Sequence, residues 1–155
     1  MNINFISIES SRPDWAEKAF SSYEKKFNKS ININWVGLRP RSRGRNYNPS
    51  EIVEKESELL FSKVKERDLV IALDREGMEL NTSKLRIQFD NWVSGSRNIS
   101  LIIGGPDGLS KNLLNRSDFC WSLSGLTFPH SLVPILIIEQ LYRVWSITQN
   151  HPYHK

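Results

Sequence analysis

Short apolar segments alternate with helical segments along this chain, and this order constrains the fold more than any other feature. Five segments have the alternating or continuous apolar pattern of β-strands: Asn2 to Ile8, Ile31 to Leu38, Asp68 to Asp74, Asn98 to Ile103 and Phe119 to Leu123. Strands that alternate with helices build a parallel sheet, so the sequence predicts an α/β fold with a mostly parallel sheet and flanking helices. Since no linker or repeat divides the chain, we expect residues 1–155 to form a single domain.

The intervening segments carry apolar residues at helical spacing. These are the residues after Pro13, Glu51 to Glu66, a segment capped by Thr82 or Ser83, a short segment from Ser110, and Leu132 to about Gln149. In the first three, the residues expected to face the core are Trp15, Ala19, Phe20, Tyr23, Phe27, Ile52, Val53, Leu59, Leu60, Val64, Leu85, Phe89, Trp92 and Val93.

The last helical segment is apolar nearly all round, whereas a surface helix needs only one apolar stripe. A chain of 155 residues offers no obvious second layer to cover such a helix, so we expect a homodimer. Glu139 and Arg143 lie four residues apart on its polar stripe. At this spacing the two side chains can pair with each other. Alternatively, Arg143 faces a substrate.

Composition excludes several classes of protein. The lone Cys120 and three scattered histidines form no disulfide framework or metal-ligand cluster, so we expect no metal and a reducing, cytoplasmic setting. The longest apolar run, Leu132 to Ile138, is too short to span a bilayer, and the first twenty residues hold no apolar signal core, so we expect no membrane association. The formal net charge of +4 is too small to indicate nucleic-acid binding by itself.

Ligands of parallel sheets bind beyond the carboxyl ends of the strands. Three such ends are followed by loops: Leu73-Asp74, Gly104-Gly105, and Ser122 to Phe128. The turn from Gly104 to Gly108 fits neither a dinucleotide-binding motif nor a phosphate-binding loop. Its glycines are compatible both with a turn that binds a ligand and with a plain tight turn. The spacing of the nearby acidic residues does not define a pair of catalytic carboxylates.

Two further segments suggest RNA. Arg39, Arg41, Arg43 and Arg45 lie in one loop without acidic neighbours, a pattern that favours contact with RNA phosphates over a merely solvated loop. The tail from Asn150 to Lys155 is aromatic and basic, and it fits either a base-binding segment or a frayed terminus.

Several motifs give the whole chain a family resemblance. They are LIIGGPDGLS at Leu101 to Ser110, WSLSGLTFPH at Trp121 to His130, and EQLYRVWSITQNHPYHK from Glu139 to Lys155. Shorter matches occur at Pro13 to Trp15, Arg43-Gly44 and Leu73-Asp74. With these motifs the chain resembles the RlmH family, small SPOUT-class methyltransferases that modify a pseudouridine of large-subunit ribosomal RNA.

The resemblance implies a SPOUT fold with a C-terminal trefoil knot, a homodimer, and methylation of N3 of a pseudouridine in 23S rRNA on the assembled ribosome. The methyl donor would be S-adenosylmethionine. The positions that match the family's donor site are Leu73, Gly104, Gly105, Leu123, Ser124, Gly125, Leu126, Thr127 and Phe128. The chain departs from the family at Gly125, where relatives often carry a larger residue, and at Arg75-Glu76, which replaces a more apolar pair.

Methyl transfer to a pseudouridine nitrogen requires that the ring N–H lose its proton. His130 and His154 are the candidate proton acceptors, with Arg143 stabilising charge on the ring and Tyr153 stacking on it. Candidate RNA contacts are Arg39, Arg41, Arg43, Arg45 and Lys155. The alternatives are a catalytically silent RNA- or ribosome-binding module and a different small-ligand enzyme whose glycine turn holds a nucleotide.

Overall fold

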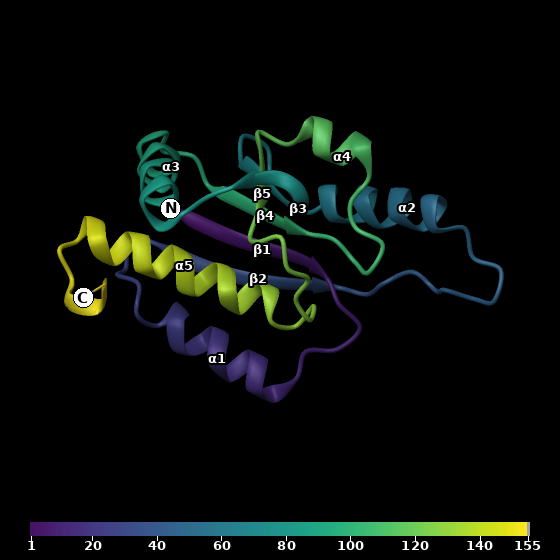
Figure 1. The fold of residues 1–155 in the computed structure, drawn as a ribbon, viewed down its shortest axis with the longest axis horizontal. Helices are drawn as coiled ribbons and strands as arrows, with labels where there is room; N and C mark the ends of the chain where they lie inside the picture. The colour runs from purple at the N-terminus through teal and green to yellow at the C-terminus, as the bar shows by residue number, and fades with distance from the viewer. Residues whose placement is uncertain (155) are drawn as a thin grey trace.

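The computed structural model describes residues 1–154, and Lys155 together with the side chain of His154 lies outside the described residues. Five parallel strands form one sheet in the order β2-β1-β4-β3-β5. The strands are β1 (Asn2–Ile8), β2 (Asn32–Leu38), β3 (Leu69–Glu79), β4 (Ile99–Ile103) and β5 (Phe119–Ser122). The predicted α/β fold with a mostly parallel sheet is therefore confirmed (Figure 1).

Helices cover both faces of the sheet (Figure 1). One face packs against α1 (Asp14–Glu24), α3 (Thr82–Ser94) and α5 (Val133–Thr148), and the other against α2 (Pro49–Phe61) and α4 (Lys111–Arg116). A short 3₁₀ helix, η1 (Pro152–His154), follows α5. Every residue of the inner strand β4 is buried, which explains its continuous apolar sequence.

The helix α5 lies between α1 and α3 and packs on the sheet, so the chain itself covers most of its apolar surface. Ile137, Ile138 and Val144 are fully buried without a second subunit. The expectation that the chain has no second layer for this helix is thus wrong. Its apolar character therefore gives no argument for a dimer.

Several local expectations also need correction. Trp15 is 53% exposed, because the buried stripe of α1 runs through Ala16 and Phe20 instead. Val93 lies on the outer side of α3 at 40% exposure. The cap of α3 is Asn81, whose side-chain oxygen accepts the N–H of Lys84 at 2.9 Å, and neither Thr82 nor Ser83.

The second helix departs most from its predicted pattern. It begins at Pro49 and ends at Phe61, several residues before the predicted end, and Val53, Leu59 and Val64 are only partly buried. Glu56 is buried in their place, on the same stripe as Ile52 and Leu60. None of the described helices has the length and apolar character needed to cross a membrane.

Candidate functional site

A cavity of about 540 Å³ opens at the carboxyl ends of β4 and β5 and beside β3 at Leu73. The three segments singled out in the sequence form its walls. Of the residues predicted for the donor, all but Gly125 line it: Leu73, Gly104, Gly105, Leu123, Ser124, Leu126, Thr127 and Phe128. We refer to it as the donor cavity. Its volume lies within the range of small-molecule binding sites.

The first wall is an interruption of β3. The strand was expected to end at Asp74, but it continues to Glu79 after an irregularity. Leu73 and Met78 both pair with Trp121 of β5, so residues 74–77 leave the ladder and bulge outward. Gly77 closes this bulge, since a Cβ there would lie 2.8 Å from the backbone of Cys120. The bulge brings Asp74, Arg75 and Glu76 to the cavity, including the pair that departs from the family pattern.

The second wall is the Gly104–Gly108 turn, and its glycines serve the protein's own packing. A Cβ on Gly104 would lie 2.7 Å from the carbonyl oxygen of Gly108. A Cβ on Gly105 would lie 2.7 Å from a carboxylate oxygen of Glu56. Gly108 has φ +84°, a conformation that favours glycine. The glycines are therefore needed to close the turn, which also lines the cavity.

The third wall is the segment from Leu123 to Phe128. The Ser124 hydroxyl oxygen accepts the N–H of Leu126 at 3.0 Å, which shapes this segment locally. Leu126 is 70% exposed at the cavity. A Cβ on Gly125 would meet only the Glu79 carboxylate, at 3.8 Å, so this position has room for a small side chain.

His130 lies where two cavities meet. It lines the donor cavity and also a smaller one of about 220 Å³, which is bordered by Arg12 and Trp35 at the carboxyl ends of β1 and β2. Its Nε2 bonds to the Ile8 carbonyl oxygen and must donate, because a carbonyl only accepts. In the neutral ring, Nδ1 is then left as a hydrogen-bond acceptor.

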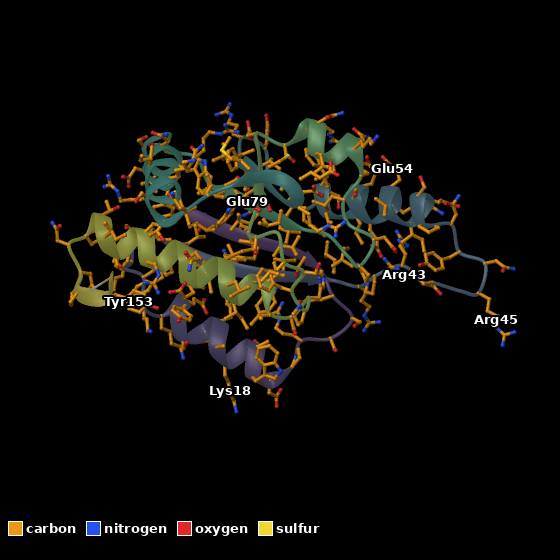
Figure 2. All side chains as sticks on the ribbon, in the orientation of Figure 1. Lys18, Arg43, Arg45, Glu54, Glu79 and Tyr153 are labelled. Carbon is orange, nitrogen blue, oxygen red and sulfur yellow. The ribbon has the colours of Figure 1, made fainter. Side chains whose placement is uncertain are left out.

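The basic loop holds two kinds of arginine. Arg39, Arg41 and Arg45 are exposed, and within residues 1–154 their side chains form no ion pair. Arg45 extends from the loop into solvent (Figure 2). Arg43 instead donates to Glu56 at 2.9 and 3.0 Å and to Asp107 at 2.9 Å. Two carboxylates therefore occupy the guanidinium of Arg43 and raise its pKa, mainly through the hydrogen bond to Glu56. The contact of Arg43 with RNA phosphates stays a prediction.

The tail packs against its own chain, with Tyr153 near the C-terminal end of α5 (Figure 2). The Tyr153 hydroxyl donates to Glu139 at 3.0 Å and lies 3.3 Å from the Tyr23 hydroxyl, while its ring packs edge-on against Tyr142. Burial, followed by these hydrogen bonds, raises the pKa of Tyr153, so the phenol stays protonated at neutral pH. Arg143 pairs with Glu139 at 2.5 Å, which confirms the predicted ion pair within the helix.

Neither Arg143 nor Tyr153 lines the donor cavity. Val133 at the start of α5 does, and Arg143 lies ten residues further along the helix, roughly 15 Å at 1.5 Å per residue. His154 belongs to η1 by its backbone, but its side chain and Lys155 lie outside the described residues, so the roles predicted for them stay predictions.

The described residues contain no group of three histidine, cysteine or acidic side chains that could hold a metal ion. Cys120 is half-buried, and burial raises the pKa of its thiol, with a smaller contribution from Asp74. Cys120 is not among the residues that line the donor cavity.

Comparison with known proteins gives consistent matches over the full chain. Residues 1–154 match the family model described as "Predicted SPOUT methyltransferase". The chain is 36% identical to the ribosomal RNA large subunit methyltransferase H of Hydrogenovibrio crunogenus, covering 100% of this chain and 99% of that protein. It is also 36% identical to the protein of the same name from Chromohalobacter salexigens, covering 100% of both.

A solved structure, the SpoU methyltransferase AviRb from Streptomyces viridochromogenes in complex with AdoMet, aligns with a TM-score of 0.43 and 11% identity. The alignment covers 92% of this chain and 57% of that one. This similarity is too weak to carry an argument about the present chain.

Proposed function

Because the chain belongs to the SPOUT methyltransferase family, we propose that it transfers a methyl group from S-adenosylmethionine to large-subunit ribosomal RNA. The observation that carries the proposal is the full-length match, at 36% identity, to two proteins named ribosomal RNA large subunit methyltransferase H. The finer part, methylation of N3 of a 23S pseudouridine on the assembled ribosome in the cytoplasm, rests on the resemblance of the sequence motifs.

The donor cavity fits a donor of this chemistry. Leu73, Leu126 and Phe128 offer apolar surface for the adenosine rings. The carboxylates of Asp74 and Glu76 line the same cavity and suit the positive charges of a sulfonium and an amino group. When bound, the sulfonium supplies an electrophilic methyl group. The protein must then align the acceptor and remove its proton.

His130 is the residue best placed for proton removal. It borders both the donor cavity and the smaller cavity beside Arg12 and Trp35, so an acceptor ring in the smaller cavity would lie next to the donor. The hydrogen bond to the Ile8 carbonyl fixes the tautomer with Nδ1 free to accept a proton. Among the candidate catalytic residues whose side chains the structure describes, His130 is the one that lines the donor cavity.

We further propose that Arg143 and Tyr153 act on the substrate bound by a second copy of the chain. Arg143 on α5 and Tyr153 on η1 both lie outside the lining of the donor cavity of their own copy, and Tyr153 is held in place by Tyr23 and Glu139. In a twofold dimer, the tail of one copy can approach the cavity of the other. The alternative is that the tail detaches and folds back on its own copy.

Mixing two inactive variants distinguishes these cases. In a heterodimer of His130→Gln and Arg143→Ala, one shared site retains both residues only if Arg143 acts across the interface. Half of randomly mixed dimers are heterodimers and each holds one intact site of two, so we expect about a quarter of the wild-type methylation rate. Neither variant alone should be active, and a mixture without activity would contradict the shared site.

The exposed arginines of the basic loop are proposed to hold RNA. Replacing Arg39, Arg41 and Arg45 together with glutamine should weaken ribosome association and flatten its dependence on salt concentration, with a log–log slope reduced by about two to three. Filter binding over a series of salt concentrations measures this slope. Replacing Lys29, Lys63 and Lys65 instead changes net charge equally outside the loop, and an identical effect of this control would contradict a specific role of the loop.

Methyl incorporation tests the proposed function as a whole. The purified protein, given labelled S-adenosylmethionine and ribosomes that lack the modification, should transfer label to 23S rRNA. Digestion to nucleosides and mass spectrometry should then identify N3-methylpseudouridine. Label on another nucleoside would contradict the finer proposal, and tight donor binding without any transfer to RNA would contradict the coarser one.

A further inference from the structure

A group of three charged residues, of which Glu56 is buried, joins the basic loop to the second wall of the donor cavity. Glu56 of α2 is 1% exposed, and its two carboxylate oxygens accept Nη1–H and Nη2–H of Arg43 at 2.9 and 3.0 Å. The Nε–H of the same guanidinium donates to Asp107 in the Gly104–Gly108 turn at 2.9 Å. One arginine of the loop thus connects a helix on the sheet with a turn that lines the cavity (Figure 2).

The backbone next to Arg43 adds two hydrogen bonds to this connection. Arg41 donates its backbone N–H to Glu56 at 2.8 Å, and its carbonyl oxygen accepts Nη1–H of Arg43 at 3.1 Å. In the Gly104–Gly108 turn, a Cβ on Gly105 would lie 2.7 Å from Glu56 and 3.4 Å from Arg43, so the turn packs closely against both side chains. The basic loop and the turn therefore pack against the same pair of charged groups.

We propose that Arg43 is a positioning residue that holds the Gly104–Gly108 turn in the shape needed for the donor and locks the basic loop to it. RNA held by the exposed arginines of the loop is thereby fixed relative to the donor cavity. The identity of the donor rests on the proposed function, but the ordering of the turn does not. This role differs from contact with RNA, which was expected from the sequence.

Two mild substitutions test the connection without removing the charge opposite Glu56. Arg43→Lys keeps a cation, but a lysine lacks the planar fork that reaches two carboxylates at once. Asp107→Ala removes the acceptor on the turn and leaves Arg43 paired with Glu56. Arg45→Lys, in the exposed part of the same loop, is the matched control.

Hydrogen exchange of the free protein gives the first readout. The backbone N–H of Gly108 donates to the Gly105 carbonyl at 3.0 Å and closes the turn, so its exchange rate reports the turn's order directly. We expect this rate to rise about tenfold in Arg43→Lys and in Asp107→Ala, the effect of losing one charge-assisted hydrogen bond. The double variant should exchange no faster than the single variants, because both break the same bond.

Calorimetry with S-adenosylmethionine gives the second readout, with a Kd expected to rise about tenfold in the same two variants and to stay unchanged in Arg45→Lys. Unchanged exchange at Gly108 in both variants, or additive effects in the double variant, would overturn the positioning role. If the wild-type protein fails to bind S-adenosylmethionine, the proposed function fails, and the exchange measurement still decides the role of Arg43.

Discussion

Replacing Arg43 with alanine is expected to lower the free energy of unfolding by about 3–5 kcal/mol. The Glu56 carboxylate is almost completely buried on α2, and two of its hydrogen bonds come from Arg43. Without them, the backbone N–H of Arg41 is the one donor left to it among residues 1–154, so most of its lost hydration is no longer offset. Urea unfolding followed by circular dichroism measures the change.

Two controls separate the buried pair from ordinary surface charge. Lys55→Ala removes the exposed pair with Glu51 on the same helix and should leave the unfolding midpoint unchanged. The double variant Arg43→Met/Glu56→Leu should recover much of the stability lost in Arg43→Ala, since apolar side chains of similar volume can replace a buried ion pair. Equal, small effects of Arg43→Ala and Lys55→Ala would show that Glu56 is solvated in solution.

The sequence pattern predicts the sheet well because each strand carries its own signal. β1 alternates polar and apolar residues and β4 is continuously apolar, and both lie within one residue of their predicted limits. The interruption of β3 carries no such signal. Residues 74–77 leave the ladder because of where β5 pairs, and Gly77 is required by the close approach of Cys120, a contact between segments over forty residues apart.

The sequence indicates the environment of apolar residues more directly than that of charged ones. Arg43 belongs to a run of regularly spaced arginines, and nothing in that run separates it from Arg45. The feature that indicates a buried arginine lies on another segment. Glu56 follows Ile52 and precedes Leu60 at four-residue intervals, so it falls on the buried stripe of α2. An acid on an apolar stripe indicates a buried partner, but the sequence does not indicate which of four arginines it is.

The donor residues were predicted from the resemblance, and the fold explains why those segments meet. The interruption of β3 after Leu73 and the carboxyl ends of β4 and β5 lie at one edge of the sheet, so Leu73, Gly104 and Leu123 converge although they are far apart in sequence. The tail was predicted as the substrate side, but its packing on Tyr23 depends on how α1 and α5 lie together. The trefoil knot and the homodimer stay predictions from the family.

Replacing His130 with glutamine is expected to lower kcat for methyl transfer by about 10²–10⁴, the usual contribution of a positioned general base. The glutamine amide can still donate to the Ile8 carbonyl, as the imidazole Nε2–H does, so the local fold should survive. The variant lacks Nδ1, the ring nitrogen that in the wild-type protein is free to accept the proton from the acceptor nitrogen. Single-turnover methylation of ribosomes at saturating donor measures this step.

The same variant should bind S-adenosylmethionine within about threefold of wild type, because a general base acts on the reaction step and contributes little to ground-state binding. A matched control is Ser131→Ala, which alters the neighbouring residue at the smaller cavity without removing a base. If His130→Gln methylates at the wild-type rate, the proton leaves by another route, and His154 becomes the candidate to test. If the variant instead loses donor affinity with kcat unchanged, His130 shapes the donor cavity and does not act as the base.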